Sequence, residues 1–141
     1  MPPDEFTVST DRSRLDLAVI HGFLSRSYWA KNIPKETVQR SIEHSLCFGV
    51  YHRDQQVGFA RVISDFSTVA YVCDVFILEP YRGEGLSKQL MSHIKGHPDL
   101  QGLRRWMLVT RDAHGLYEQF GFTNVAHPER YLEIVVTNAY G

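Results

Sequence analysis

Residues 72–91 read VCDVFILEPYRGEGLSKQLM, and this stretch holds a strand, a tight turn and the start of a helix. The apolar run 72–78 is typical of a buried strand, and apolar residues at helical spacing begin at Leu86. Between the two, Gly83 and Gly85 let backbone amides turn inward without a Cβ in the way. The helix that follows adds its unpaired N–H groups and the positive end of its dipole. The stretch therefore predicts a pocket for a phosphate-like anion.

The surrounding sequence predicts an α+β fold with a mixed, mostly antiparallel sheet and helices on both faces. A strand at 69–78, a crossover helix at 85–96 and a strand at 105–110 make its one parallel pair. The other expected elements are a strand at 5–9, helices at 13–26 (behind Asp11 and Ser13) and 34–44, a hairpin of strands at 46–52 and 56–64, a short helix capped by Asp112 and a last strand at 131–137. The glycine turn follows the carboxyl end of its strand, where ligands bind in such sheets.

The composition of the chain fits one globular domain, residues 1–141. A chain of 141 residues can bury about two thirds of its unfolded surface. Its hydrophobic content of 43% supports a packed core, and its formal net charge of -1 offers no bulk attraction to nucleic acid. We expect a local anion pocket and no nucleic-acid partner.

The sequence favours a cytoplasmic protein without a membrane partner. Its start, MPPDEFTVST, lacks the basic and apolar segments of a secretion signal, and no apolar run approaches the roughly 20 residues of a membrane span. Cys47 and Cys73 do not form a C-x-x-C pair, so reduced thiols are expected.

Several other kinds of site are disfavoured. A dinucleotide G-x-G-x-x-G needs glycine where Lys88 stands, and no P-loop string occurs. His93 and His97 lack the glutamate of H-E-x-x-H, so we expect no metal site. Cys73 has no base tied to it in sequence, which argues against covalent catalysis.

Two segments resemble the GCN5-related N-acetyltransferase (GNAT) family. Residues 82–87, RGEGLS, are similar to its Q/R-x-x-G-x-G/A motif, directly between a strand and a helix. Residues 113–122, AHGLYEQFGF, are similar to its A-x-x-L-Y-x-x-x-G-F segment. The resemblance covers roughly residues 5–137 and implies the acyl-CoA N-acyltransferase fold. This chain departs from the family at Ser87, which replaces Gly or Ala, and at Thr110, where many members have Asn.

The resemblance implies a site for acetyl-CoA as cosubstrate. The backbone of Val75, Phe76 and Ile77 would pair with the pantetheine arm, and the pyrophosphate would lie on Arg82, Gly83, Glu84, Gly85, Leu86, Ser87 and Lys88. Tyr117 would face the sulfur and protonate the departing thiolate, a task that suits a hydroxyl of pKa near 10.

The residue that would act as base for the acceptor amine is left open among several carboxylates. An amine must lose a proton before it attacks a thioester, so a carboxylate or an ordered water should act as base. Asp74, in the middle of an apolar strand, is the first candidate for that base, and Asp65, Glu79 and Glu133 are runners-up. The alternative for Asp74 is a structural carboxylate held by a neighbouring group.

An acceptor pocket is expected beside the loop between the first two helices. In the family this loop covers the acceptor, which implies that Tyr28 and Trp29 line its site; they could equally cap the core. Together with Asp65, Tyr71 and Asp74 they would favour a cationic amine.

These features predict an N-acetyltransferase that moves acetyl directly from acetyl-CoA to a primary amine of a small molecule. The alternatives are a non-catalytic acyl-CoA sensor and a peptide or protein N-acetyltransferase. A homodimer is expected only as a habit of the family.

Overall fold

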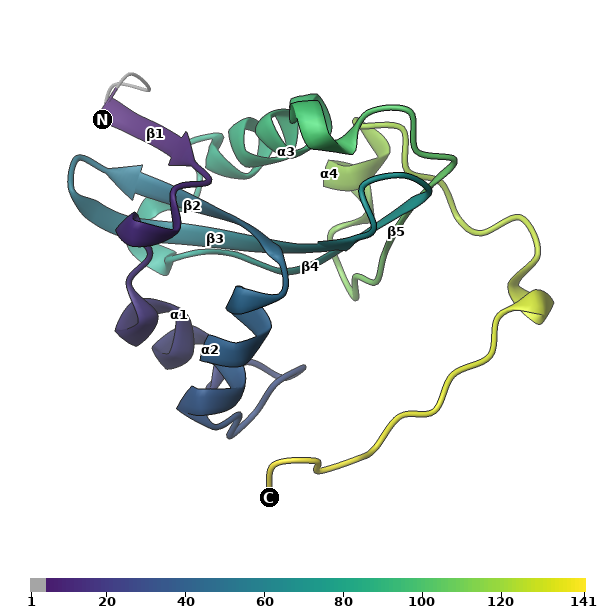
Figure 1. The fold of residues 1–141 in the computed structure, drawn as a ribbon, viewed down its shortest axis with the longest axis horizontal. Helices are drawn as coiled ribbons and strands as arrows, with labels where there is room; N and C mark the ends of the chain where they lie inside the picture. Colours follow the sequence, from purple (N-terminus) through teal and green to yellow (C-terminus); the bar gives the residue numbers. More distant parts are fainter. Residues whose placement is uncertain (1–4) are drawn as a thin grey trace.

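The computed structural model describes residues 5–141 and shows one five-stranded sheet (Figure 1). The strands lie in the order β1-β2-β3-β4-β5: Phe6–Ser9, Leu46–His52, Gln55–Ser64, Val69–Ile77 and Arg105–Leu108. Neighbours pair antiparallel up to β4, and β4 pairs with β5 in parallel. The predicted mixed, mostly antiparallel sheet is confirmed.

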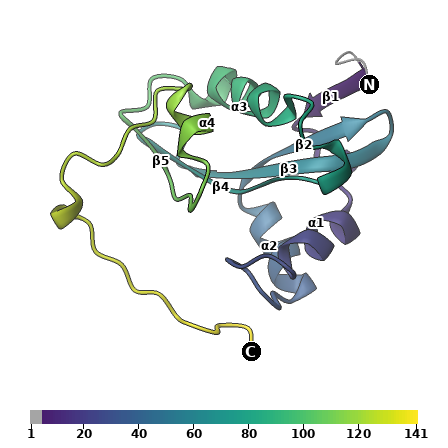
Figure 2. The same ribbon diagram turned by 180° about the vertical axis from the view of Figure 1, so that it is seen from behind.

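Helices cover both faces of the sheet (Figures 1 and 2). The helices α1 (Leu17–Leu24) and α2 (Lys35–Glu43) pack on one face, and α3 (Leu86–Gly96) and α4 (His114–Glu118) lie on the other. One buried cluster includes Leu90, Met91 and Ile94 of α3, and a second includes Ile20 of α1 and Val38 of α2. The sheet is therefore buried on both sides, and β4 is its second strand from one edge.

The ends of two helices differ from expectation. The first helix begins at Leu17 because the Asp16 carboxylate accepts the amide hydrogens of Ala18 and Val19, which makes Asp16 its N-cap. The predicted cap of α4 by Asp112 is wrong. Ala113 precedes that helix, and the Thr110 hydroxyl accepts the Ala113 N–H at 3.1 Å.

A β-bulge in β4 changes the direction of its side chains. Phe59 pairs with Phe76 but Arg61 pairs with Cys73, so the single residue Ala60 faces two residues, Asp74 and Val75, and β4 carries one extra residue. Asp74 adopts a left-handed conformation, φ +54°, which aspartate tolerates better than most residues. The bulge leaves Val72 and Val75 on the α3 side of the sheet and turns Asp74 toward the other face.

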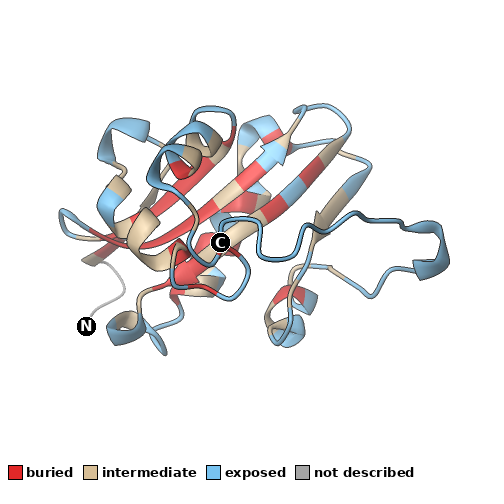
Figure 3. Ribbon diagram, turned by 90° about the horizontal axis from the view of Figure 1, so that it is seen from below, coloured by how far each residue is buried: buried red, intermediate tan, exposed pale blue. Residues whose placement is uncertain are grey.

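The predicted last strand, 131–137, is wrong for this chain on its own. Beyond a 3-10 turn at Pro128–Arg130 the chain runs extended and away from the sheet, and Figure 3 shows it exposed along its length. Leu132 and Ile134 are 96% and 97% exposed. The alternating pattern is present, but no strand of the same chain pairs with it among residues 5–141.

The structure also bears on whether the chain could cross a membrane. Between residues 5 and 141, none of the helices combines the length and apolar character needed to cross a bilayer. Residues 1–4, the first part of the segment that we expected to lack a secretion signal, lie outside the described residues.

Candidate active site

The glycine turn has the geometry of an anion cradle. Gly83 and Gly85 are left-handed, at φ +82° and +76°, and a Cβ built on either meets no atom within 4 Å. Gly85 is also the N-cap of α3 and offers no side-chain cap to the first amides of the helix. These N–H groups are left for an anion. The predicted helix start at this turn is confirmed.

The side chains of the turn are spread around this opening. Arg82 donates from Nε to the carbonyl oxygen of Ile77 at 3.0 Å, which anchors the guanidinium at the end of β4. Glu84 and Lys88 are exposed, Ser87 is half-buried, and Leu86 is buried in the core under α3. The cradle is thus built from backbone amides, with Lys88 as the cation in the first turn of the helix.

One edge of β4 is open beside this cradle. The pairing with β5 runs from Val69–Arg105 to Val72–Leu108 and stops there, because β5 ends at Leu108. Residues 73–77 have no strand neighbour on that side within the part of the chain that the structure describes. The side chains of Phe76 and Ile77 are buried, so only their backbone can meet a ligand here. An open edge of this kind can take an extended ligand as an added strand, so the expected pairing with a pantetheine arm stays a prediction.

Asp74 stands at the far end of the open edge and is fully engaged. Its Oδ2 accepts from Arg61 Nε at 2.8 Å, and its Oδ1 accepts from Trp29 Nε1 at 2.9 Å. Burial alone would lower the pKa of Arg61, but the Asp74 carboxylate raises it above its ordinary value. To accept a proton, Asp74 would have to weaken this ion pair. Its role as base stays a prediction, and its contacts also match the structural alternative.

Tyr117 lies on α4 in a buried position, 8% exposed. Its ring packs edge-on against Phe122, with 6.0 Å between ring centroids, and its hydroxyl has no hydrogen-bond partner in residues 5–141. Burial raises the pKa of Tyr117, and the neighbouring Tyr28 adds to the rise. The phenol therefore keeps its proton at neutral pH and presents an unpaired hydroxyl.

Tyr28 and Trp29 form an aromatic pair beside Asp74, and Tyr28 lies near enough to Tyr117 to raise its pKa. The rings of Tyr28 and Trp29 meet edge to face, with 5.1 Å between centroids, and Trp29 holds Asp74. The Arg111 guanidinium lies 3.9 Å from the centroid of the Tyr28 ring, in the loop between β5 and α4. Three predicted acceptor-side residues are thus brought together: Tyr28, Trp29 and Asp74. Sequence reasoning missed Arg61 and Arg111, because each meets its partner across a long stretch of chain.

Tyr71 and Asp65, the other two residues predicted for the acceptor pocket, make no hydrogen bond or ring contact with Tyr28 or Trp29 within residues 5–141. Tyr71 is partly exposed on β4, and its pKa is raised by burial and by the nearby Cys73 and Asp74. Asp65 is not part of the cluster, since its carboxylate accepts the amide hydrogens of Ser67, Thr68 and Val69 in the β3–β4 turn. Those bonds, led by the Thr68 hydroxyl, lower the pKa of Asp65. The turn lies about 15 Å along β4 from Asp74.

The runner-up bases and the absence of a metal stay predictions. Glu79 opens the short 3-10 turn Glu79–Tyr81 before the cradle, and Glu133 lies in the exposed C-terminal segment. Across residues 5–141 there is no group of three or more His, Cys, Asp or Glu side chains placed to hold a metal ion.

Comparisons with known proteins agree with this geometry. A model of the acetyltransferase (GNAT) domain matches residues 43–124, which include both β4 and the cradle. A candidate acetyltransferase of Gibberella zeae is 30% identical across 80% of this chain and 76% of its own length. The crystal structure of a candidate GNAT acetyltransferase from Xanthomonas campestris is 53% identical, covers 99% of this chain and 98% of that chain, and superposes with a TM-score of 0.94.

A more distant structure shares the fold alone. It is a candidate acetyltransferase from Clostridium acetobutylicum, crystallised with acetyl-CoA, at 12% identity and a TM-score of 0.65 over 92% of this chain and 94% of that chain. The family match over more than half of the chain and the curated relative decide the assignment: the chain belongs to the GNAT family of acetyltransferases, whose members use acetyl-CoA.

Proposed function

We propose that the protein transfers acetyl directly from acetyl-CoA to the primary amine of a small molecule, within a ternary complex. One observation carries the proposal: the open edge of β4 has an anion cradle at one end and the Asp74–Trp29–Tyr28–Tyr117 cluster at the other. This order matches the coenzyme, whose pyrophosphate and thioester lie at opposite ends of the pantetheine arm.

The chemistry follows from that order. The amine nitrogen attacks the thioester carbonyl carbon, the C–S bond breaks, and the thiolate takes the proton of the Tyr117 hydroxyl. Backbone amides at the bulge polarise the carbonyl, and holding both substrates in line supplies most of the acceleration. The proton of the amine passes to Asp74 or, through water, to solvent.

The acceptor enters from the side of α1 and α2. Trp29 and Tyr28 offer aromatic faces to a cationic amine, and Asp74 offers negative charge next to them. Because Arg61 already balances Asp74, the aromatic faces supply much of this preference. We also propose a cytoplasmic location and no nucleic-acid or membrane partner, as the sequence predicts.

The direct test combines binding and turnover. Calorimetric titration with acetyl-CoA measures binding, and thiol release across a panel of small amines and short peptides measures transfer. We expect binding together with turnover on small amines. Binding without turnover on any acceptor would favour the sensor, and turnover on peptides alone would favour peptide acetylation.

A further inference from the structure

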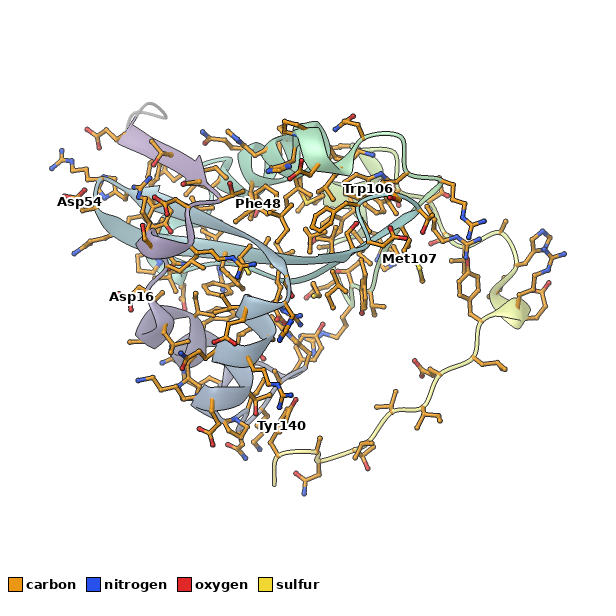
Figure 4. The ribbon with its side chains drawn as sticks, in the orientation of Figure 1. Asp16, Phe48, Asp54, Trp106, Met107 and Tyr140 are labelled. Atoms are coloured by element: carbon orange, nitrogen blue, oxygen red, sulfur yellow. The ribbon has the colours of Figure 1, made fainter. Side chains whose placement is uncertain are left out.

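Arg111 lies in the loop between β5 and α4, beside the aromatic pair of the acceptor side. Its guanidinium carbon is held over the Tyr28 ring, 3.9 Å from the ring centroid. Figures 1 and 4 show this loop reaching past the sheet toward the face that α1 and α2 cover, with side chains in the space between. Two segments far apart in the sequence therefore place a cation at the wall of the proposed acceptor pocket. The proposed chemical step gives this cation no task.

The two arginines of this region are paired to very different extents. Arg61 forms a mostly buried ion pair with Asp74 at 2.8 Å, so the charge of Asp74 is already balanced. Arg111 pairs only with the next residue, Asp112, at 4.0 Å, and the two side chains are 65% and 77% exposed. An exposed pair of this length contributes little and is easily replaced by another partner. Arg111 is therefore the cation of the pocket that a ligand can use.

The setting of Arg111 suits recognition of a carboxylate. The cation–π contact with Tyr28 restrains the guanidinium, whose planar fork of N–H donors matches the two oxygens of a carboxylate. Restraint before binding reduces the entropy that is lost when the pair forms. One guanidinium also balances one carboxylate, whereas a phosphate dianion would keep a net charge beside it. A polyamine would instead bring its positive charges toward a fixed cation, which counts against that class of acceptor.

The amine end of an acceptor has separate neighbours. Asp74 accepts a hydrogen bond from Trp29, whose ring meets that of Tyr28 edge to face with 5.1 Å between centroids. Trp29 is 43% exposed, so aromatic surface remains open to an amine next to the Asp74 carboxylate. Arg111 lies one ring farther along, on Tyr28. This order fits a short acceptor with an amine at one end and an anion at the other.

We propose that the acceptor amine carries a carboxylate, as an amino acid does, and that Arg111 is the residue that selects it. This inference rests on the proposed transfer of acetyl to a small amine. The carboxylate pairs with the guanidinium over Tyr28, and the amine then lies along Trp29 toward the bulge of β4, where the thioester is expected. Arg111 determines specificity and takes no part in the chemical step.

The test is thiol release with matched pairs of acceptors. The acids are α-amino acids and the straight-chain ω-amino acids from β-alanine to ε-aminocaproate, and each is paired with its carboxamide, which removes the charge at nearly constant size. The wild type should use the best acid about 10- to 100-fold better than its amide in kcat/KM, the effect of one hydrogen bond to a charged group. Arg111→Gln should lose this preference through a higher KM for acids and leave the amides unchanged. Arg111→Lys keeps the charge and should retain part of the preference.

Arg53→Gln is the matched control. Arg53 is a similarly exposed arginine in a surface pair with Glu5, in the turn between β2 and β3, and its variant should treat both series as the wild type does. Equal use of acids and amides by the wild type, or an Arg111→Gln variant that slows both alike, would overturn this inference and leave acetyl transfer standing. Binding of acetyl-CoA without turnover on either series would overturn the proposed function as well. Melting curves check that each variant is folded.

Discussion

Gly85→Ala tests the cradle, and the chain offers a matched control for it in Gly102→Ala. The two glycines have nearly the same backbone, φ +76° and +75°, and a Cβ on either meets no atom within 4 Å. A left-handed alanine costs about 1–2 kcal/mol at each position. At about 4 °C per kcal/mol for a chain of this size, both variants should melt about 4–8 °C below the wild type.

The two variants should differ in coenzyme binding. Only Gly85 is the N-cap of α3, where the proposed pyrophosphate meets the first amides of the helix. A Cβ at position 85 would stand where the proposed pyrophosphate approaches these amides, and we expect it to break one of their hydrogen bonds. Loss of one hydrogen bond to a charged group costs about 1.5–3 kcal/mol, or roughly 10- to 100-fold in Kd. Gly102 follows the short turn Pro98–Leu100, away from the cradle, and its variant should bind normally. Calorimetry with acetyl-CoA measures both. Equal affinity in the two variants would refute the placement of the cradle.

Three further outcomes are expected. Tyr117→Phe should lower turnover about 10²- to 10⁴-fold with coenzyme affinity unchanged. In the wild type, burial raises the pKa of Tyr117 above its unfolded value near 10, so the protonated acid persists up to that pH and the alkaline fall in rate should lie above pH 10. A fall in rate near pH 8 would assign the acid to another group. Asp74→Asn keeps an acceptor for Trp29 but leaves the mostly buried Arg61 without its ion-pair partner, so it should lower the free energy of urea unfolding by about 2–3 kcal/mol. It should abolish turnover only if Asp74 is the base, and turnover near the wild-type rate would favour water. Burial raises the pKa of Cys47 to about 11 and that of the half-buried Cys73 to about 12, so iodoacetamide at pH 8 should label both thiols much more slowly in the native protein than after unfolding. Labelling of the native protein as fast as that of the unfolded chain would contradict this.

The sequence predicted best where local patterns decide the structure. The helix at Leu86–Gly96 was expected at 85–96, because its apolar spacing and the left-handed glycine before it are both local signals. The strands from Leu46 to Ile77 were likewise placed to within about one residue. The grouping of Tyr28, Trp29 and Asp74 depended on the family resemblance.

The failures share a non-local cause. The bulge at Asp74 depends on its pairing with β3, and the ion pair joins Asp74 to Arg61 on that neighbouring strand, so neither is visible in the alternation of β4 alone. Asp65 stays a prediction that was based on charge; the residues next to it in the turn, Thr68 among them, donate hydrogen bonds to its carboxylate. The strand at 131–137 has the right pattern and lacks a partner in its own chain.

The most direct test of the account is a crystal structure of the protein with acetyl-CoA. We expect the pyrophosphate within hydrogen-bond distance of the amides of 83–88, the pantetheine arm along residues 73–77 of β4, and the sulfur beside the Tyr117 hydroxyl. Coenzyme bound elsewhere, or a thioester far from Tyr117 with the pyrophosphate in the cradle, would contradict the central claim that this edge of β4 aligns the coenzyme for transfer.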